Sequence, residues 1–478
     1  MRSVFIAAAI GVSCGGPGAP VGAVAFALAD DACARYCGAV TRAELYRVGE
    51  VGFPLGPPVQ VDCGEPMTFS GLPAGTQVFA TLEVFDAVGT RRLAGTSDNV
   101  TVPTDDDTAE ATIHLEAEVV PHVTSVSPEP VVVADGPVDV VMTGDGLSEP
   151  GSVAIDGIPI IADWAAASVQ VQDGVPGGEL VVESCGIPSR PVVVRVIGSA
   201  LGRAAVSQVP GCTVVAVAAD GDDVLAAFDC GASPSYVQRL ASDGSCPLDG
   251  DDVWSLPGRP TALAPGFVGL LGGGLATFEA HAPGPAARVD AGLVRALAAS
   301  DAGVFGIVDE RLVQVDAGLA PVAGIESSFV LVDVAALGAS VMVLAASGDE
   351  ARLIELTPPG EPLTRSVSSC HGPRAFAVDG DHWVLACTGE VVVVARGDGA
   401  QTPVAVDGTR VVLDPRGDVA FIAAAQSLTA IDMQHVLHTW ATPGFTLLGR
   451  LADPIARLVT TVGGLEVWTP YDARGPCP

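Results

Sequence analysis

Apolar and polar residues alternate in one recurring pattern along the second half of the chain, from about residue 214 to residue 470. Each copy has an apolar run, a turn with Asp or Gly, a second apolar run and a shorter amphipathic stretch. The clearest copies begin at Val214, Val294, Pro373 and Thr409, and weaker copies begin near Thr261, Val330 and Thr446. Alternation with a period of two indicates strands, so each copy predicts several short strands joined by tight turns.

The copies start roughly 33–47 residues apart, a period typical of β-propeller blades, each of which is a four-stranded sheet. Seven copies favour seven blades within residues 199–478. The seventh copy provides only three strands, whereas the segment from Ala204 to Val209 is strand-like and precedes the first copy. We expect this segment to pair with the strand that contains Trp468, because such closure of the ring removes exposed sheet edges.

Residues 21–118 alternate in the same way but without the repeat. The stretches VQVDC, FSGLPAGTQVFATLEVFDAVG and RRLAGTSDNVTV predict half-buried strands, and the turn from Leu72 to Thr76 leads into a long strand. This arrangement resembles the Ig-like or fibronectin-like sandwiches of bacterial surface proteins. The resemblance implies a first β-sandwich module.

Residues 119–198 carry a more specific pattern. A Val-Thr-Ser-Val-Ser-Pro start ends at Pro128, a turn contains Gly144 and Gly146, a V-x-I-D-G strand begins at Val153, and Trp164 follows. The stretch resembles an IPT/TIG domain, an Ig-like fold common in cell-surface receptors and bacterial exported proteins. The resemblance implies a second sandwich and no particular activity. The expected fold is therefore all-β, with two Ig-like modules followed by a propeller.

The N-terminus indicates export. Residues 1–13 have one Arg and a short apolar core, and Cys14 is followed by a Gly- and Pro-rich tether over residues 14–20. This resembles a bacterial lipoprotein signal, which implies lipidation of Cys14 and attachment to the outer membrane or cell surface. The alternative is ordinary secretory cleavage after Ala25, preceded by Ala23 and Val24.

Eleven cysteines fit an exported protein, because ten remain for disulfides once Cys14 is lipidated or removed. In the repeats, Cys212 and Cys230 take the same two places as Cys370 and Cys387. We expect each pair to join the ends of one inner hairpin. Cys246 and Cys477 then remain as a third pair between adjacent blades. The pairing of Cys33, Cys37, Cys63 and Cys185 stays open.

The formal net charge is −33, and all 23 basic residues are Arg. A chain this acidic repels nucleic acid and anionic lipid. We therefore expect no nucleic-acid partner, and we expect the chain to contact the membrane through the lipid anchor only. The expected partner is a surface protein, a polysaccharide or a small anionic ligand.

The chain has no sequence motif of the common hydrolases, metalloproteases or nucleotide-binding enzymes. His435 and His438 lie three apart in a predicted strand and point to opposite faces, and the acidic turns fit hairpins, so we expect no metal or cofactor. The predicted inner strands consist mainly of Ala, Val and Leu, which argues against an enzyme. A propeller lyase or hydrolase that acts on envelope or extracellular polymers is the alternative.

Arg295, Arg374 and Arg410 each stand where a predicted inner strand begins, with Arg259 and Arg450 nearby. Such positions gather at one mouth of a propeller, and guanidinium groups bind carboxylates and phosphates in bidentate fashion. The three arginines are therefore the candidate ligand contacts of a binding protein. The alternative is that they pair with acidic side chains or loop carbonyls between blades, in a purely structural surface protein.

Overall fold

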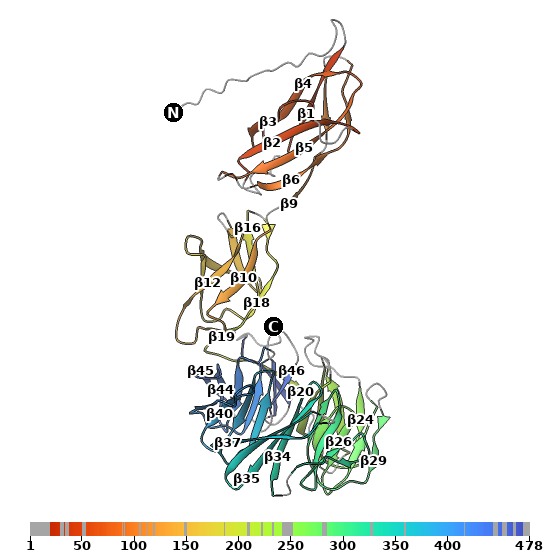
Figure 1. Ribbon diagram of the computed structural model, residues 1–478, viewed down its shortest axis with the longest axis vertical. Helices are drawn as coiled ribbons and strands as arrows, with labels where there is room; N and C mark the ends of the chain where they lie inside the picture. Colours follow the sequence, from red (N-terminus) through yellow and green to blue (C-terminus); the bar gives the residue numbers. More distant parts are fainter. Residues whose placement is uncertain are drawn as a thin grey trace. The chain divides into compact units, whose positions relative to one another are not determined.

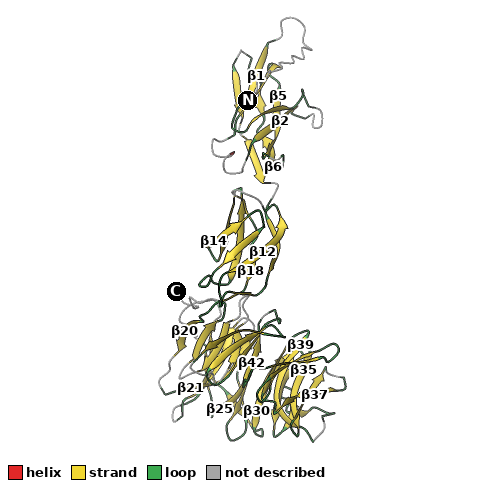
Figure 2. Ribbon diagram, turned by 90° about the vertical axis from the view of Figure 1, so that its left-hand side faces the viewer, coloured by secondary structure: helices red, strands yellow, loops and turns green. Residues whose placement is uncertain are grey.

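The computed structural model describes residues 20–471 except for positions 29–32, 34–37, 50–53, 88, 90, 105–106, 112, 118–119, 148–150, 186, 208–210, 221–222, 232–233, 241–251, 280–283, 326–327, 358–359, 415, 443–447, 452–456 and 462–464. All named elements of this part are strands, so the protein is all-β, as the sequence predicts (Figures 1 and 2). The chain divides into two compact units, of residues 1–128, 139–170 and 179–192, and of residues 129–138, 171–178 and 193–478. The domain boundaries drawn from the sequence stay predictions.

The N-terminal part of the first unit has two sheets, with the orders β4-β1-β8 and β3-β2-β5-β6-β9, and β7 pairs with β5. The strands are β1 (Val21–Phe26), β2 (Val40–Arg47), β3 (Val59–Asp62), β4 (Met67–Pro73), β5 (Gln77–Phe85), β6 (Arg91–Ser97), β7 (Val100–Thr101), β8 (Thr108–Ala111) and β9 (Ile113–Ala117). Buried side chains such as Val24, Phe26 and Leu82 form a common core, and a disulfide joins Cys33 to Cys63.

The next sheet has the order β10-β12-β15-β14-β13-β16-β17, and β18 pairs with β16. The strands are β10 (His122–Ser127), β12 (Val138–Asp145), β13 (Gly151–Ile155), β14 (Ile158–Asp163), β15 (Ser168–Val171), β16 (Gly178–Ser184), β17 (Ile187–Pro188) and β18 (Val192–Val194). A Cβ atom on Gly144 would lie 1.9 Å from the His122 carbonyl oxygen. Only glycine therefore lets β12 approach β10 here, and Gly146 adopts a φ of 70° at the end of β12.

In the second unit, six successive sheets share one plan, in which each strand pairs with the one before it. Each sheet is named here by its first strand. The strands are β21 (Thr213–Asp220), β22 (Asp223–Asp229), β23 (Tyr236–Leu240) and β24 (Val253–Ser255); β25 (Pro260–Ala264), β26 (Phe267–Leu270), β27 (Leu275–Thr277) and β29 (Ala287–Val289); β30 (Val294–Ser300), β31 (Gly303–Val308), β32 (Arg311–Gln314) and β33 (Ala320–Pro321); β34 (Val330–Leu337), β35 (Ser340–Ser347), β36 (Glu350–Leu356) and β37 (Leu363–His371); β38 (Ala375–Val378), β39 (His382–Ala386), β40 (Val391–Ala395) and β41 (Gln401–Val404); β42 (Arg410–Leu413), β43 (Ala420–Ala423), β44 (Ser427–Ile431) and β45 (Val436–Ala441).

A further sheet combines a strand that precedes these six sheets with three strands that follow them. Its order is β20-β48-β47-β46, with β20 (Gly202–Ser207), β46 (Leu448–Leu451), β47 (Arg457–Thr461) and β48 (Leu465–Thr469). β20 runs antiparallel to β48, with Arg203 opposite Trp468 and Ala204 opposite Val467. This is the pairing that the incomplete last repeat predicts. The described sheets therefore form a propeller-like fold, whose strands carry the green to blue colours in Figure 1.

Neighbouring sheets share apolar side chains. The fully buried Leu344 and Leu353 of the β34 sheet pack with Trp383 and Leu385 of the β38 sheet in one cluster. The burial of one leucine side chain stabilises the fold by roughly 1.5–3 kcal/mol, so such shared clusters hold neighbouring sheets together. We call each contact region between two neighbouring sheets a seam. One connection also crosses a seam, because β28 (Gly284–Pro285) leaves the β25 sheet and pairs with β24 in parallel.

Short segments that precede the propeller-like sheets belong to the same compact unit. β11 (Val131–Val132) pairs in parallel with β19 (Val196–Ile197), and Val131, Val196 and Ile197 are almost fully buried. Ile197 lies in the cluster that contains Phe421 and Tyr471. Residues 129–138 and 193–197 are therefore packed into the second unit.

Candidate functional site

The predicted arginines stand where first strands begin. Arg295 is the second residue of β30, Arg374 directly precedes β38, and Arg410 is the first residue of β42; Arg259 directly precedes β25. Blades of a propeller repeat the same strand directions around the axis, so these positions lie toward one end of that axis. We call the set of Arg259, Arg295, Arg374 and Arg410 the arginine end. Arg450 lies in β46, whose side chains are outside the described residues.

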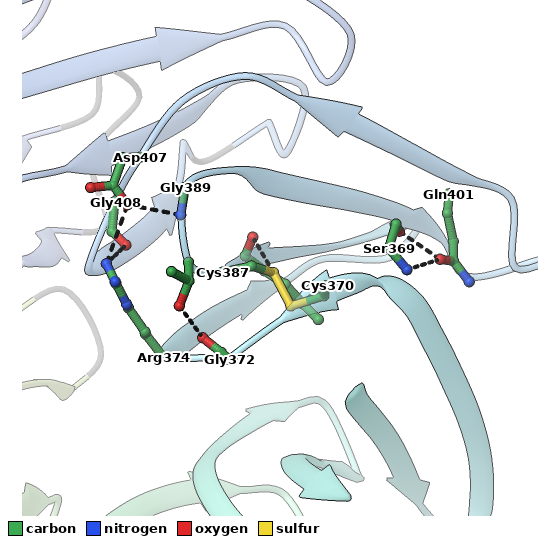
Figure 3. The surroundings of a disulfide bond; sticks show 11 residues. Ser369, Cys370, Gly372, Arg374, Cys387, Gly389, Gln401, Asp407 and Gly408 are labelled. Atoms are coloured by element: carbon green, nitrogen blue, oxygen red, sulfur yellow. Dashed lines mark hydrogen bonds and ion pairs between the residues drawn. A yellow bond between two sulfur atoms is a disulfide. The ribbon is translucent and has the colours of Figure 1, made fainter. Parts of the chain in front are cut away.

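Two of these arginines reach a neighbouring sheet. Arg374 Nη1 lies 3.2 Å from Asp407 Oδ1 and 3.2 Å from the carbonyl oxygen of Gly408, both in the connection to β42 (Figure 3). Arg259 donates to Asp229 Oδ2, at the end of β22, with an Nε–O distance of 2.8 Å. The hydrogen bond from Arg259 lowers the pKa of Asp229. These contacts are the interblade pairs of the structural alternative.

Arg295 and Arg410 differ from that pattern. Arg295 Nη2 lies 3.1 Å from Glu310 Oε1 within its own sheet, and 43% and 66% of the two side chains are exposed. An exposed ion pair of this kind stabilises by less than about 1 kcal/mol. Arg410 is exposed and makes no ion pair or side-chain hydrogen bond with any other described residue. Its guanidinium group is therefore open to a ligand.

Asp333, in β34, is the acidic group that Arg410 influences. Its Oδ1 accepts the backbone N–H of Val334 at 2.9 Å, and the backbone of Phe376 in β38 also donates to the carboxyl. Burial raises the pKa of Asp333 to about 6, although these two hydrogen bonds and the positive charge of Arg410 oppose the shift. Sequence reasoning missed this residue, because a single Asp in an apolar strand has no spacing pattern.

A buried charge cluster forms at the other end of β42, and the sequence did not predict it. Arg195 is 1% exposed and donates to Glu129, Asp414 and Asp418, with an Nε–Oε1 distance of 2.8 Å to Glu129. Arg416 reaches Glu129 Oε1 at 3.2 Å. We call these five residues the Arg195 cluster.

The Arg195 cluster holds the segment before β19 on the β42–β43 turn. Burial disfavours the charged guanidinium, but the hydrogen bonds to Asp418 and Glu129 outweigh it and raise the pKa of Arg195. Burial also raises the pKa of Tyr471, whose ring centre lies 6.0 Å from the Arg195 guanidinium carbon. Arg195 therefore stays charged and Tyr471 stays neutral at neutral pH, and the cluster is a structural anchor.

Disulfides join Cys212 to Cys230 and Cys370 to Cys387, the two pairs that the repeat positions predict. The placement of Cys370 was wrong, however. It lies in β37, the last strand of the β34 sheet, so its disulfide crosses to the end of β39 and links two sheets (Figure 3). Gln401 of β41 also accepts from the Ser369 hydroxyl at 2.7 Å across the same seam.

The structure describes only some of the remaining cysteines. Cys185 is disulfide-bonded, and Cys33 pairs with Cys63. Cys14, Cys37, Cys246 and Cys477 lie outside the described residues, so the lipidation and the Cys246–Cys477 pair stay predictions. Among the described residues, no three His, Cys, Asp or Glu side chains lie together as metal ligands. No helix of the described part is long and apolar enough to span a membrane.

No protein-family model matches the chain, and no curated protein does. Among solved structures, the WD40 domain of Pan2 from Neurospora crassa is 10% identical, covers 58% of this chain and 97% of its own, and has a TM-score of 0.43. The extracellular domain of a hybrid two-component system from B. thetaiotaomicron is 12% identical, covers 82% of this chain and 57% of its own, and has a TM-score of 0.40. Overlaps this weak carry no information on the function of the chain.

Proposed function

We propose that the protein is an exported binding protein, in which two Ig-like modules, the second of the IPT/TIG type, carry a seven-bladed propeller. Six sheets of one plan and the combined β20-β48-β47-β46 sheet support seven blades. Disulfides support an oxidising compartment outside the cytoplasm. Lipidation of Cys14 would anchor the chain to the envelope. Cleavage after Ala25 would cut through β1 and remove the buried Val24, which favours cleavage before Cys14.

The binding site of this proposal is the arginine end. Arg410 carries the argument, because its exposed guanidinium group has no ion-pair partner among the described residues. Arg295 adds a second exposed cation, since its pair with Glu310 is open to water. Anionic groups of a small molecule, a polysaccharide or a surface protein suit such donors.

The other end of the same strands is less available. Asp414 follows β42 directly, whereas Arg410 begins it, so the Arg195 cluster and the arginine lie at opposite ends of one short strand. At the Asp414 end, the carboxylate of Asp414 is already paired with Arg195, which also pairs with Glu129. This contrast favours the arginine end as the surface that faces a partner.

A triple substitution tests the proposal. In the full chain, R295A/R374A/R410A should weaken the binding of citrate at low salt at least tenfold, as measured by isothermal titration calorimetry, and added salt should weaken wild-type binding. The control R288A/R311A/R352A removes the same charge from other strands and should bind citrate as the wild type does. Equal citrate binding by the two triple variants would count against the arginine end.

A purely structural role is the second candidate, and the Arg374–Asp407 and Arg259–Asp229 contacts between neighbouring sheets favour it. Thermal melts separate this role from ligand binding. If the interblade arginines are struts, R259A should lose roughly 1–3 kcal/mol of unfolding free energy, because the buried Asp229 is left unpaired. R295A/R410A breaks only one exposed pair, so its loss should stay below about 1 kcal/mol, and a larger loss would favour the structural role.

A further inference from the structure

One position in the first strands is occupied by alanine in four sheets and by opposite charges in two others. In β21, β25, β30 and β34 the strand has a bulge, and the residue after it is Ala216, Ala262, Ala296 or Asp333. In β38 and β42 the first residue of the strand takes this place, as Ala375 or Arg410. The carboxyl and the guanidinium group therefore stand at one level of the propeller axis, two sheets apart.

The groups around Asp333 come from three consecutive first strands. β34 supplies the carboxyl and the Val334 N–H at 2.9 Å, β38 supplies the backbone donor at Phe376, and β42 supplies Arg410. Asp333 is only partly exposed, which restricts its contact with water. The positive charge of Arg410 acts to lower the pKa of Asp333, yet no hydrogen bond or ion pair joins the two side chains within the described residues.

This separation leaves complementary chemistry for a ligand. A guanidinium group without an acidic partner holds a carboxylate through parallel N–H donors. A carboxyl group hydrogen-bonds a hydroxyl group in either protonation state, as acceptor when it is ionised and as donor or acceptor when it is protonated. An ammonium group in place of the hydroxyl group would be repelled by Arg410 but attracted by an ionised Asp333, so alanine is the probe that separates an amino acid from a hydroxy acid.

We propose that Arg410 and Asp333 form a binding site for a hydroxy acid, whose carboxylate is held by Arg410 and whose hydroxyl group is hydrogen-bonded by Asp333. The inference rests on the proposed binding function and names the ligand class of that site. A free hydroxy acid and an acidic sugar unit of a polysaccharide share this chemistry. Alanine at the equivalent position of the other sheets means that D333A and R410A introduce a side chain the fold already accepts there.

Matched probes test the site in the full-length protein. Lactate and propionate differ only by a hydroxyl group, and D-galacturonate and D-galactose differ in the carboxylate. By titration monitored with NMR at pH 7, wild type should bind lactate about fivefold more tightly than propionate, since one hydrogen bond is involved. Galacturonate should bind at least tenfold more tightly than galactose. Tighter binding of polygalacturonate than of the monomer would assign the site to a polysaccharide, and equal binding per sugar unit to a free acid.

The variants separate the two roles. R410A should lose at least tenfold in affinity for both lactate and propionate, whereas D333A should bring their affinity ratio to about one. R311A, which removes a cation from β32 outside the arginine end, should keep the fivefold preference, and thermal melts establish that each variant is folded. A preference that survives D333A, or tighter binding of alanine than of lactate, would overturn the hydroxy-acid site while leaving anion binding intact. If the wild type binds none of the acids, the proposed binding function fails with it.

Discussion

Arg195 is a single residue on which distant parts of the second unit converge. Its carboxylate partners Glu129, Asp414 and Asp418 lie 66, 219 and 223 positions away in the sequence. The local sequence around it is that of one more valine-rich strand, so nothing in its own neighbourhood indicates a buried cation. Only the fold brings the acidic groups together. The arginine end was found from the sequence for the opposite reason, since the repeats place those residues near the starts of first strands.

Removal of the buried cation should be costly. R195M would leave the fully buried Asp414 without its cationic partner, and we expect a loss of about 3–5 kcal/mol of unfolding free energy. Urea denaturation followed by tryptophan fluorescence measures it. The control R416M removes a cation that is 40% exposed and should cost less than about 1 kcal/mol. Similar losses in the two variants would contradict the anchoring role.

Asp333 should make stability depend on pH in a defined window. Because its folded-state pKa of about 6 lies above the usual value of 3.8, the native state binds more protons than the unfolded state between about pH 4 and pH 6. The unfolding free energy should therefore fall as the pH rises through this window and then level off. Relative to D333N, wild type should lose about 1–2 kcal/mol between pH 4 and pH 7 in urea denaturation. Parallel curves for the two proteins would show that Asp333 does not titrate as described.

At the scale of strands, alternation predicted well where a strand follows its own hairpin. The first strands of the seven sheets begin within two residues of the seven repeat starts, from Thr213 to Leu448. Cys370 shows where the pattern failed. Its repeat position suggested an inner hairpin, but it lies near the end of the long strand β37, and a register shift lies between Val367 and His371. Irregular pairing of this kind leaves no trace in a period-two pattern, so the linkage between two sheets could not be predicted.

The disulfide that joins these sheets should matter for stability. C370A/C387A opens a covalent loop with a sequence separation of 17, and we expect a loss of about 3 kcal/mol in unfolding free energy. Peptide mapping of the unreduced wild type should recover Cys370 linked to Cys387. C212A/C230A is the matched control, because that pair closes a loop of separation 18 around one hairpin. In hydrogen exchange, only C370A/C387A should weaken protection on both sides of the seam, in β37 and in β39. Unchanged exchange in β37 would speak against a linkage between sheets.

At the scale of the whole molecule, charge and cysteine content favoured an exported protein that does not bind nucleic acid, and the strand pattern predicted the all-β fold. The proposed ligand class, by contrast, is argued from individual side chains of the structure. A net charge of −33 with arginine as the sole basic residue argues against nucleic acid as a partner on electrostatic grounds alone. Composition could not indicate which arginines stay unpaired. Arg374 pairs with Asp407, whereas Arg410 has no such partner among the described residues. This difference depends on the loops between strands, which the repeat pattern does not predict.

Lipidation of Cys14 should determine whether the protein is attached to the membrane. C14S removes the predicted lipidation site, so the variant should leave the membrane fraction and appear in the soluble fraction, while the wild type sediments with membranes. S13A is the matched control and should fractionate as the wild type does. Immunoblots of separated fractions measure the distribution. Equal membrane association of C14S and wild type would remove the lipid anchor from the proposal.

The pairing of β20 with β48 has a consequence for the order in which the protein is made. These strands lie before and after the six sheets of one plan, so the sheet that they share can form only after translation reaches about residue 469. Contacts of such high sequence separation slow folding. A growing or truncated chain would hold β20 without its partner, as an open edge that invites aggregation or proteolysis. The sheet of β20 is therefore completed only in chains that extend through β48.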